Sequence, residues 1–181
     1  MRVIAGIARG RILKALEGEE TRPTTDKVKE SVFNIIQFDI EGKRVLDLFA
    51  GSGQLAIEAI SRGAKSAVAV EASRKAADIV KENVKRCGFA DEISIYRGDF
   101  SEVLTKGAKY DVIFLDPPYN SNLLARSLEL IYSFDILSDG GIMVCESESS
   151  SAPVKIPESG YSFRTYRYGR VLLTVIRKSE N

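Results

Sequence analysis

The sequence predicts an α/β protein with a doubly wound, mostly parallel sheet, on three observations. From residue 44 onward, short apolar runs alternate with amphipathic helical segments, which is the pattern of repeated strand–helix–strand units. A glycine-rich turn follows the first of these runs, as in sheets that bind nucleotides at their carboxyl edge. The last two runs have no helix between them and predict an antiparallel hairpin. The chain has 181 residues and is predicted to form one domain, 1–181.

The first 42 residues precede this pattern and are predicted to form a small β-hairpin and a helix. The hairpin pairs residues 3–7 with 11–15 around a turn at Arg9-Gly10. Residues 24–26 are polar and are predicted to cap the helix that follows. The helix is amphipathic, with Val28, Val32, Ile35 and Ile36 predicted on its inner face and Lys27, Lys29 and Glu30 on its outer face.

The body of the chain is predicted to alternate strands and helices up to the final hairpin. Strands are expected at 44–49, 66–70, 92–96, 110–115 and 142–146, and helices at 51–61, 72–86 and 123–134. A turn is expected at 139–141. Residues 161–168 and 171–177 then form the hairpin, which turns at Gly169-Arg170.

Composition excludes several kinds of site. The sequence has no histidine, so it has neither a Ser-His-Asp triad nor a histidine-ligated metal. Cys87 and Cys145 do not form a disulfide framework or a metal-ligand spacing, and no metal is predicted. The sequence shows no apolar run long enough to span a bilayer and no charged-then-apolar leader. We therefore expect a cytoplasmic protein without a membrane partner.

The charges are unevenly distributed, although the net charge is only +1. Residues 1–16 carry four basic side chains and no acidic one, and residues 153–181 carry six basic and two acidic ones. The segment between them is therefore acidic. Basic ends around an acidic middle suit a polyanionic partner held at the ends and a cationic ligand held in the centre. Basic termini that serve only solubility are the alternative.

The stretch Asp116-Pro117-Pro118-Tyr119 follows an apolar run that is typical of a buried parallel strand. Two consecutive prolines cannot continue a sheet, so the chain leaves it just after Asp116, at the edge where such sheets bind ligands. The Asp116 carboxylate and the Pro117 carbonyl can accept from both N–H groups of an exocyclic amine, and Tyr119 can stack on its ring. The stretch therefore suits alkylation of a base amino group. A turn that only caps the next helix is the structural alternative.

A glycine turn, Gly51-Ser52-Gly53, follows the first strand of the body and opens a helix, and its glycines let the backbone approach a ligand closely. Glu71 lies at the end of the next strand, 20 residues after Gly51, where a carboxylate can accept from both ribose hydroxyls. A dehydrogenase would share these two features, so they leave the nucleotide open.

Acidic residues at two further strand ends favour S-adenosylmethionine over a nicotinamide dinucleotide. Asp47 ends the strand before the glycine turn, where its charge would repel a pyrophosphate and attract an ammonium or sulfonium group. Asp99 follows the third strand and can accept from an adenine amine. Asp116-Pro117-Pro118-Tyr119 has no role in hydride transfer. The predicted cofactor is therefore S-adenosylmethionine, held by Asp47, Phe49, Gly51, Gly53, Glu71, Asp99, Phe100 and Asp116.

The segment from Thr21 to Lys27 is rich in groups that can hold phosphates. It includes Arg22, Thr24 and Lys27 at the start of the predicted helix, which is a plausible anion site. A helix cap with solvated charges is the alternative.

Four stretches together resemble the RsmD family: Asp47–Gly53, Glu58–Ala64, Asp116–Tyr119 and Thr21–Glu30. Its members are guanine-N2 methyltransferases that act on 16S ribosomal RNA of the small ribosomal subunit. The resemblance covers nearly the whole chain, and Thr21–Glu30 is its discriminating part. The sequence departs from the family pattern at three places: Ala5 replaces a second glycine, Gln54 replaces a small residue, and Gly169-Arg170-Val171 lacks the usual acid.

The resemblance implies a Rossmann-like class I methyltransferase sheet, with residues 1–42 as an extension that binds RNA. It implies that the target guanine is turned out of the RNA, since base-modifying enzymes need to reach the base. The catalytic group would be Asp116, Pro117, Pro118 and Tyr119, and RNA phosphates would be held by Arg9, Arg11, Arg22, Thr24, Lys27 and Lys29.

The expected partner is 16S ribosomal RNA, within the small subunit or an assembly intermediate, and the expected protein is a monomer. Two alternatives remain open. One is an adenine-N6 methyltransferase acting on DNA or RNA, because the same tetrapeptide serves that amine. The other is a non-catalytic RNA-binding assembly protein that keeps the fold.

Overall fold

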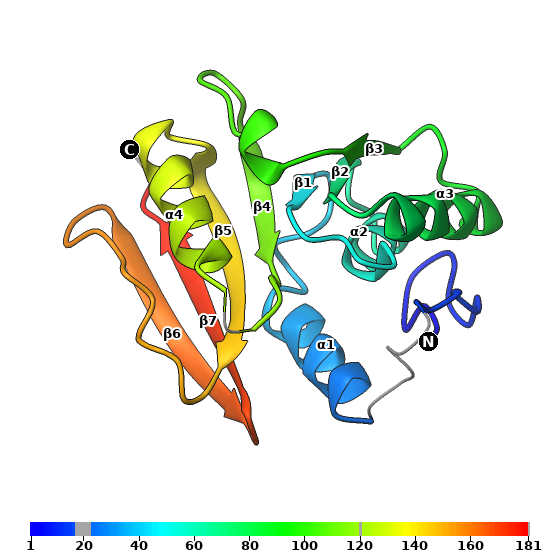
Figure 1. Cartoon of the computed structure of the whole chain (residues 1–181), viewed down its shortest axis with the longest axis horizontal. Helices are drawn as coiled ribbons and strands as arrows, with labels where there is room; N and C mark the ends of the chain where they lie inside the picture. Colours follow the sequence, from blue (N-terminus) through cyan, green and yellow to red (C-terminus); the bar gives the residue numbers. More distant parts are fainter. Residues whose placement is uncertain (17–22, 120, 181) are drawn as a thin grey trace.

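One seven-stranded sheet organises the molecule, in the order β3-β2-β1-β4-β5-β7-β6 (Figure 1). The structure is a computed structural model, which describes residues 1–16, 23–119 and 121–180. The strands are β1 Arg44–Asp47, β2 Ser66–Glu71, β3 Ile93–Arg97, β4 Tyr110–Leu115, β5 Leu137–Glu148, β6 Tyr161–Tyr168 and β7 Val171–Lys178.

The inner part of the sheet is parallel and its outer edge is antiparallel. Strands β1 to β5 all run parallel to one another, whereas β7 pairs antiparallel with both β5 and β6. The chain builds outward from β1 to β3 on one side and then crosses to β4 on the other. The gap between β1 and β4 is thus the switch point at which open sheets bind ligands. The predicted doubly wound sheet with an antiparallel C-terminal hairpin is confirmed.

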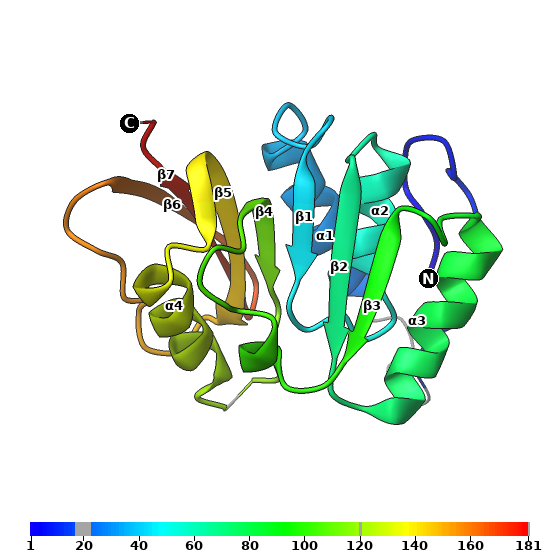
Figure 2. The same cartoon turned by 90° about the horizontal axis from the view of Figure 1, so that it is seen from above.

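Helices cover both faces of the sheet (Figure 2). On one face lie α1 Pro23–Ile35, α2 Gln54–Ser61 and α3 Arg74–Cys87, and on the other lie α4 Leu123–Ser133 and the 3₁₀-helix η1 Phe100–Glu102. Side chains alternate along each strand, so Val45 belongs to the first core and Leu46 to the second. Both cores are apolar, which explains why the strands are continuous apolar runs in the sequence.

Helix α1 differs from its prediction in its start and its buried face. It begins at Pro23, so residues 24–26 lie in its first turn and do not cap it. Proline suits this place because the first helical N–H has no partner within the helix. Lys29 is only 5% exposed, so the prediction that it faces solvent is wrong. It lies one turn before Phe33, which is fully buried, so the buried face is wider than the predicted stripe.

Strand β5 begins earlier than predicted, at Leu137, and runs through the expected turn at 139–141. Its pairing with β4 shifts register between Tyr110 and Val112. Gly140 and Gly141 therefore lie in an irregular part of the strand and do not end it. Among the described residues, none of the helices is long and apolar enough to cross a membrane.

The N-terminal hairpin is shorter than predicted. Its two arms meet in one isolated antiparallel bridge, between Arg2 and Ile12. The backbone amides that would extend the ladder bind helix α2 instead: Ile4 and Ala5 donate to the Glu58 carboxylate at 2.7 and 3.0 Å. Ser61 accepts from Ala8 at 3.0 Å. The N-terminal segment is therefore fastened to α2, and the fully buried Glu58 carboxylate binds the amides of Ile4 and Ala5.

We expect Glu58→Ala to destabilise the protein by about 2 kcal/mol. The substitution removes the acceptor of two backbone amides and of the Arg62 guanidinium, which donates to Glu58 at 2.7 Å. Urea unfolding would measure the loss, and hydrogen exchange would show whether the amides of Ile4 and Ala5 lose protection. Glu30→Ala removes an exposed carboxylate from α1 and serves as the control. Unchanged protection in Glu58→Ala would contradict the assigned fastening.

Candidate functional site

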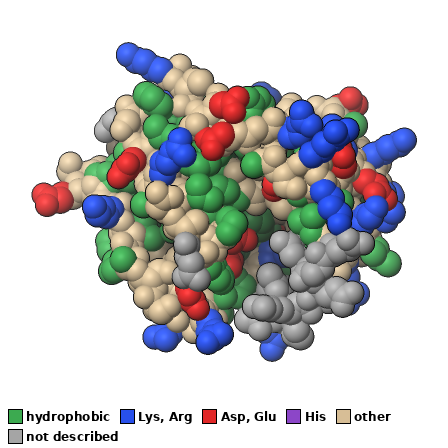
Figure 3. All heavy atoms as spheres, in the orientation of Figure 1, with side chains coloured by type: hydrophobic (Ala, Val, Ile, Leu, Met, Phe, Trp, Pro, Cys, Tyr) green, Lys and Arg blue, Asp and Glu red, His purple; other side chains and the backbone are tan. Residues whose placement is uncertain are grey.

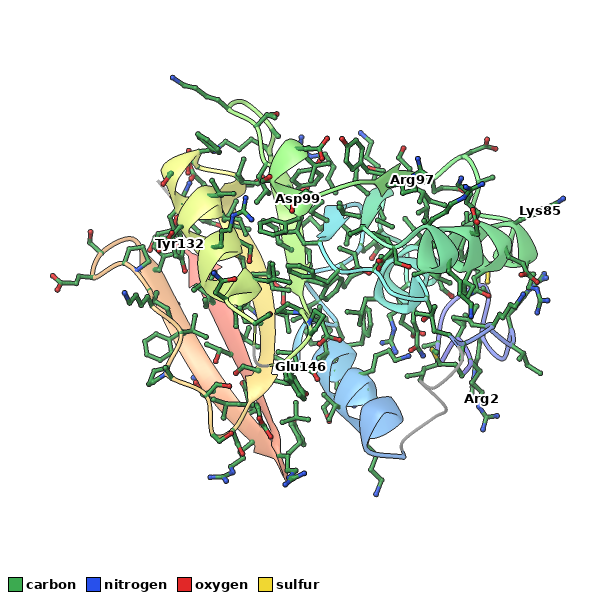
Figure 4. All side chains as sticks on the ribbon, in the orientation of Figure 1. Arg2, Lys85, Arg97, Asp99, Tyr132 and Glu146 are labelled. Atoms are coloured by element: carbon green, nitrogen blue, oxygen red, sulfur yellow. The ribbon has the colours of Figure 1, made fainter. Side chains whose placement is uncertain are left out.

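The carboxyl ends of the parallel strands share one edge of the sheet, which is lined with acidic residues. In Figure 2 the arrowheads of β1 to β4 point to the same lower edge, and this edge faces the reader in Figures 1, 3 and 4. Glu71 and Asp47 are the last residues of β2 and β1, and Asp116 directly follows β4. Asp99 lies two residues after β3, and Glu146 lies in the last part of β5 (Figure 4). The acids therefore follow the strand order along the edge.

Asp47 is the most unusual of these acids because its carboxylate is fully buried. Neither oxygen has a hydrogen-bond partner within the described part of the chain. Burial raises the pKa of Asp47 to about 7, and the nearby Glu71 carboxylate adds to the shift. The backbone amides of Ala56 and Phe49 oppose it, without reaching full hydrogen-bond geometry. A buried carboxylate without a partner is costly unless a ligand supplies a cation or a donor.

The two glycines of the turn that follows Asp47 both have positive φ but have different surroundings. Gly51 has a φ of +55°, and a Cβ at this position would meet nothing within 4 Å. Gly53 has a φ of +79°, and its Cβ would meet Val80 at 2.8 Å. Thus Gly51 borders open space, as the prediction of ligand approach requires, whereas Gly53 also serves the packing of the turn on α3.

Glu71 holds the glycine turn in place. Its carboxylate accepts from the Gly51 amide at 2.9 Å and from the Ser73 amide at 2.8 Å. Because a carboxylate has about four acceptor sites, these two bonds leave capacity for ribose hydroxyls. Its contact with the turn was not predicted from the sequence, which showed only the spacing of 20 residues.

Asp99 and Phe100 follow β3, and the Phe100 ring packs against Phe49. Asp99 is exposed, and hydrogen bonds from the Ser101 hydroxyl and from the Ser101 amide, the latter at 2.9 Å, lower the pKa of its carboxyl. The rings of Phe49 and Phe100 lie 5.4 Å apart, and the Arg126 guanidinium lies 5.4 Å from the Phe100 centroid. Phe100 is 4% exposed, so most of its ring belongs to the core. The structure thus gathers the three predicted residues.

The turn after β4 presents Asp116 and Tyr119 at the surface. Asp116 is exposed, Pro117 is buried, and Tyr119 is 41% exposed. The Tyr119 hydroxyl donates to Glu146 Oε1 at 2.6 Å. Burial and this bond raise the pKa of Tyr119 well above its usual range, so it stays protonated. Burial likewise raises the pKa of Glu146, while the Tyr119 hydroxyl opposes the shift.

A cavity of about 300 Å³ opens beside this turn. It is bounded by the turn, by α4, by the end of β5 and by the loop that follows β5. Its lining includes Pro117, Tyr119, Leu124, Tyr132, Glu146 and Glu148. Figure 4 labels two of these, Tyr132 on α4 and Glu146 on β5. Sequence reasoning missed Glu146, although the rule that found the other acids, an acid at a strand's carboxyl end, applies to it.

The residues predicted to bind RNA divide into three groups. Arg9 and Lys27 are exposed, and the exposed Arg11 donates to the backbone carbonyl of Arg86 at 2.8 Å. Lys29 is buried, so it lacks the exposure expected of a phosphate ligand on the outer surface. Arg22 lies outside the described residues, as does the side chain of Thr24.

The two cysteines are buried, and the described residues form no metal-binding cluster. No group of three or more acidic or cysteine side chains there could hold a metal ion. Cys87 and Cys145 are buried free thiols, and burial raises the pKa of Cys145 to about 12. These thiols are therefore poor nucleophiles.

Known proteins share both the sequence and the fold. YlbH of Bacillus subtilis is 45% identical over 163 residues, which cover 88% of this chain and 87% of that protein. The ribosomal RNA small subunit methyltransferase D of Haemophilus influenzae is 36% identical over 163 residues, or 88% and 84% of the two chains. The solved structure of Escherichia coli yhhF superposes with a TM-score of 0.87 at 26% identity and covers 100% and 99%.

A more distant structure, SMU.776, is complexed with SAH and shares the fold, with a TM-score of 0.69 and 13% identity over 87% and 50% of the two chains. The sheet is thus that of class I methyltransferases, as predicted. The family model described as conserved hypothetical protein 95 matches residues 1–177. With these relatives, this match shows that the chain belongs to the conserved hypothetical protein 95 family, which is the RsmD family.

Proposed function

We propose that the protein transfers a methyl group from S-adenosylmethionine to the exocyclic N2 of a guanine in 16S ribosomal RNA of the small ribosomal subunit. The observation that carries this proposal is the position of two carboxylates on neighbouring strands. Asp47 ends β1 and is buried without a hydrogen-bond partner among the described residues, and Asp116 opens the turn after β4. Asp47 pairs in register with Phe114, two residues before Asp116. A cationic cofactor and an amine substrate thus have adjacent acceptors.

The residues at the edge fit S-adenosylmethionine. Among the described residues the Asp47 carboxylate has no donor, which the cofactor's ammonium group would supply, and Gly51 borders open space. In this proposal Glu71 holds the ribose and Asp99 the adenine amine, with Phe49 and Phe100 beside them. When bound, the cofactor supplies an electrophilic methyl group. The structural neighbour that is complexed with SAH and the class I sheet support this donor.

The turn after β4 would orient the target amine. A guanine N2 is a poor nucleophile because its lone pair is delocalised into the ring. The Asp116 carboxylate and the Pro117 carbonyl would accept its two N–H groups and stabilise the positive charge that develops on the nitrogen. Tyr119 would stack on the base, and Pro118 fixes the shape of the turn. The nitrogen becomes acidic once methylated, so no separate strong base is needed.

Basic side chains of the N-terminal extension would hold the RNA, with Arg11 beside the C-terminal end of α3 through its bond to the Arg86 carbonyl. Arg9, Arg11 and Lys27 are exposed and belong to the N-terminal extension 1–42 that we propose binds RNA. Figure 3 shows further Lys and Arg side chains on the face that carries the edge, over β3 and α3, where Figure 4 labels Arg97 and Lys85. Phosphates contacted by such residues position the RNA without reading its sequence. A ribosomal RNA substrate also implies that the protein acts in the cytoplasm.

We expect Arg9→Ala to weaken RNA binding uniformly and to reduce the slope of log K against log salt concentration by about 1. The reason is that each phosphate contact releases roughly one counterion. Filter binding of 16S ribosomal RNA across a salt series would measure the slope. Lys106→Ala is the control, because Lys106 is exposed in the loop before β4, outside the N-terminal extension. Equal slopes in wild type and Arg9→Ala would show that Arg9 does not contact an RNA phosphate.

The proposed function is tested by transfer of labelled methyl from S-adenosylmethionine to unmodified small-subunit particles, with naked 16S ribosomal RNA and DNA in parallel. Nucleoside analysis then identifies the product. N2-methylguanosine supports the proposal and shows whether the particle or the naked RNA is the substrate. N6-methyladenine would establish the adenine-N6 alternative. Cofactor binding without transfer to any of these substrates would favour the non-catalytic assembly protein.

A further inference from the structure

The cavity beside Asp116 contains a carboxylate that the proposed chemistry does not use. We propose that Glu146 selects guanine by accepting the N1–H of the target base, and that the cavity holds this base. The inference rests on the proposed function and deepens it, because it assigns the choice between guanine and adenine to one residue.

The sheet places Glu146 next to Asp116. Leu115 of β4 is paired in register with Cys145 of β5, so the residues that follow them lie side by side at the carboxyl edge. The cofactor acids Asp47 and Glu71 lie on the other side of β4. Asp116 therefore stands between the cofactor side of the edge and the cavity. A base whose amine reaches Asp116 has its neighbouring ring atoms close to Glu146.

The cavity suits a single flat base. Its volume of about 300 Å³ lies at the lower end of the range of small-molecule sites, roughly 300–1,000 Å³. Pro117, Leu124 and Tyr132 give it apolar walls, and Glu146 and Glu148 supply carboxylates. Such a combination of apolar walls with few polar groups is typical of sites that bind a planar ligand in one orientation.

Hydrogen-bond chemistry decides which base fits. An ionised carboxylate only accepts hydrogen bonds. Guanine carries an N1–H donor beside its N2 amine, so both can be satisfied when N2 lies at Asp116 and N1 at Glu146. Adenine carries an N1 acceptor beside its N6 amine, and this lone pair would face the carboxylate. A site whose polar group is left unpaired by the wrong ligand rejects that ligand strongly.

The Tyr119 hydroxyl favours the ionised form of Glu146 that this choice requires, and so opposes the burial that raises the pKa of this carboxyl. The hydroxyl donates to Oε1 at 2.6 Å, which stabilises the ionised carboxylate and restricts its rotation. The other oxygen, Oε2, is the acceptor that we assign to the base. Tyr119 would thus contribute both its ring, for stacking, and its hydroxyl, for orienting the residue that reads the base.

The test compares guanine with 2-aminopurine, which keeps the 2-amino group but has an N1 acceptor in place of N1–H. After mass spectrometry of ribonuclease fragments has located the methylated guanosine, 16S ribosomal RNA ligated with either base at that position is assembled into particles. Methyl transfer at about pH 8 gives kcat/KM for both. We expect wild type to prefer guanine strongly. In Glu146→Gln the amide can donate to the N1 acceptor, so this preference should fall by roughly tenfold or more.

Three further variants make the outcome specific. Glu158→Gln removes an exposed carboxylate outside the cavity and should keep the preference. Tyr119→Phe removes the hydrogen bond to Glu146 and should reduce the preference more weakly. If Glu148→Gln changed the ratio and Glu146→Gln did not, the assignment to Glu146 would be overturned. Wild-type enzyme that forms no N2-methylguanosine would overturn the proposed function, a result independent of the ratio.

Discussion

The Asp116→Ala variant is expected to transfer methyl groups at least about 10²-fold more slowly than wild type while still binding S-adenosylmethionine. The expected loss corresponds to removal of one preorganised polar partner of the reacting nitrogen. Asp116 is exposed and lies beyond the last residue of β4, so its replacement leaves both cores intact. Single-turnover rates on the established substrate and calorimetric titration with S-adenosylmethionine measure the two quantities separately.

The control for this variant is Asp91→Ala, which removes an exposed carboxylate between α3 and β3, near the opposite edge of the sheet. It should leave both the rate and the affinity unchanged. Asp116→Asn retains one acceptor oxygen without the charge and should fall between alanine and wild type. Loss of cofactor binding in proportion to the loss of rate would show that Asp116 supports the structure of the edge and does not act on the amine.

Local sequence patterns were sufficient to locate the sheet. Parallel strands buried on both faces are continuous apolar runs, and β4 and β6 have the predicted bounds, 110–115 and 161–168. Turn signals were reliable where the turn is local, as at Gly169-Arg170. Because the carboxyl ends of parallel strands gather at one edge, the strand-end positions of Asp47, Glu71, Asp99 and Asp116 indicated that they share this edge.

Contacts between distant segments were not predictable in this way. The N-terminal amides leave their expected hairpin because Glu58 and Ser61, more than 50 residues later, offer buried acceptors. Lys29 has the spacing of an outer residue on α1, yet the helix is buried on a wider face. Glu146 obeys the strand-end rule, but only the structure shows its bond to Tyr119 and its place in the cavity.

The second large effect is expected at Asp47, where one substitution should change two properties in opposite directions. In Asp47→Asn, affinity for S-adenosylmethionine should fall by about 10²-fold, because the cofactor's ammonium group loses its charged acceptor. Without cofactor, the variant should be more stable than wild type above about pH 7. The reason is that wild type there carries a buried, ionised carboxylate that has no partner among the described residues, and the variant does not. A purely structural aspartate would lower stability when replaced.

The pH dependence fixes the sign of this effect. The pKa of Asp47 is raised from 3.8 to about 7 in the folded protein, so the folded state binds a proton more tightly than the unfolded state. Stability contributed by the protonated form is therefore complete below about pH 4 and is lost as the pH rises to about 7. The shift sets an upper limit of about 4 kcal/mol, of which we expect roughly half, because the asparagine amide is also left without partners.

Urea unfolding of the cofactor-free protein at about pH 4 and pH 8 provides the measurement. Wild type and Asp47→Asn should differ little at the lower pH, and the variant should be the more stable at the higher pH. Asp91→Asn, which changes an exposed carboxylate, should have the same stability as wild type at both pH values. Saturating S-adenosylmethionine should then reverse the order at pH 8, because only the wild-type carboxylate gains its cationic partner. If the variant were less stable without cofactor, the Asp47 carboxylate would already be satisfied by the fold and could not be the acceptor that the cofactor completes.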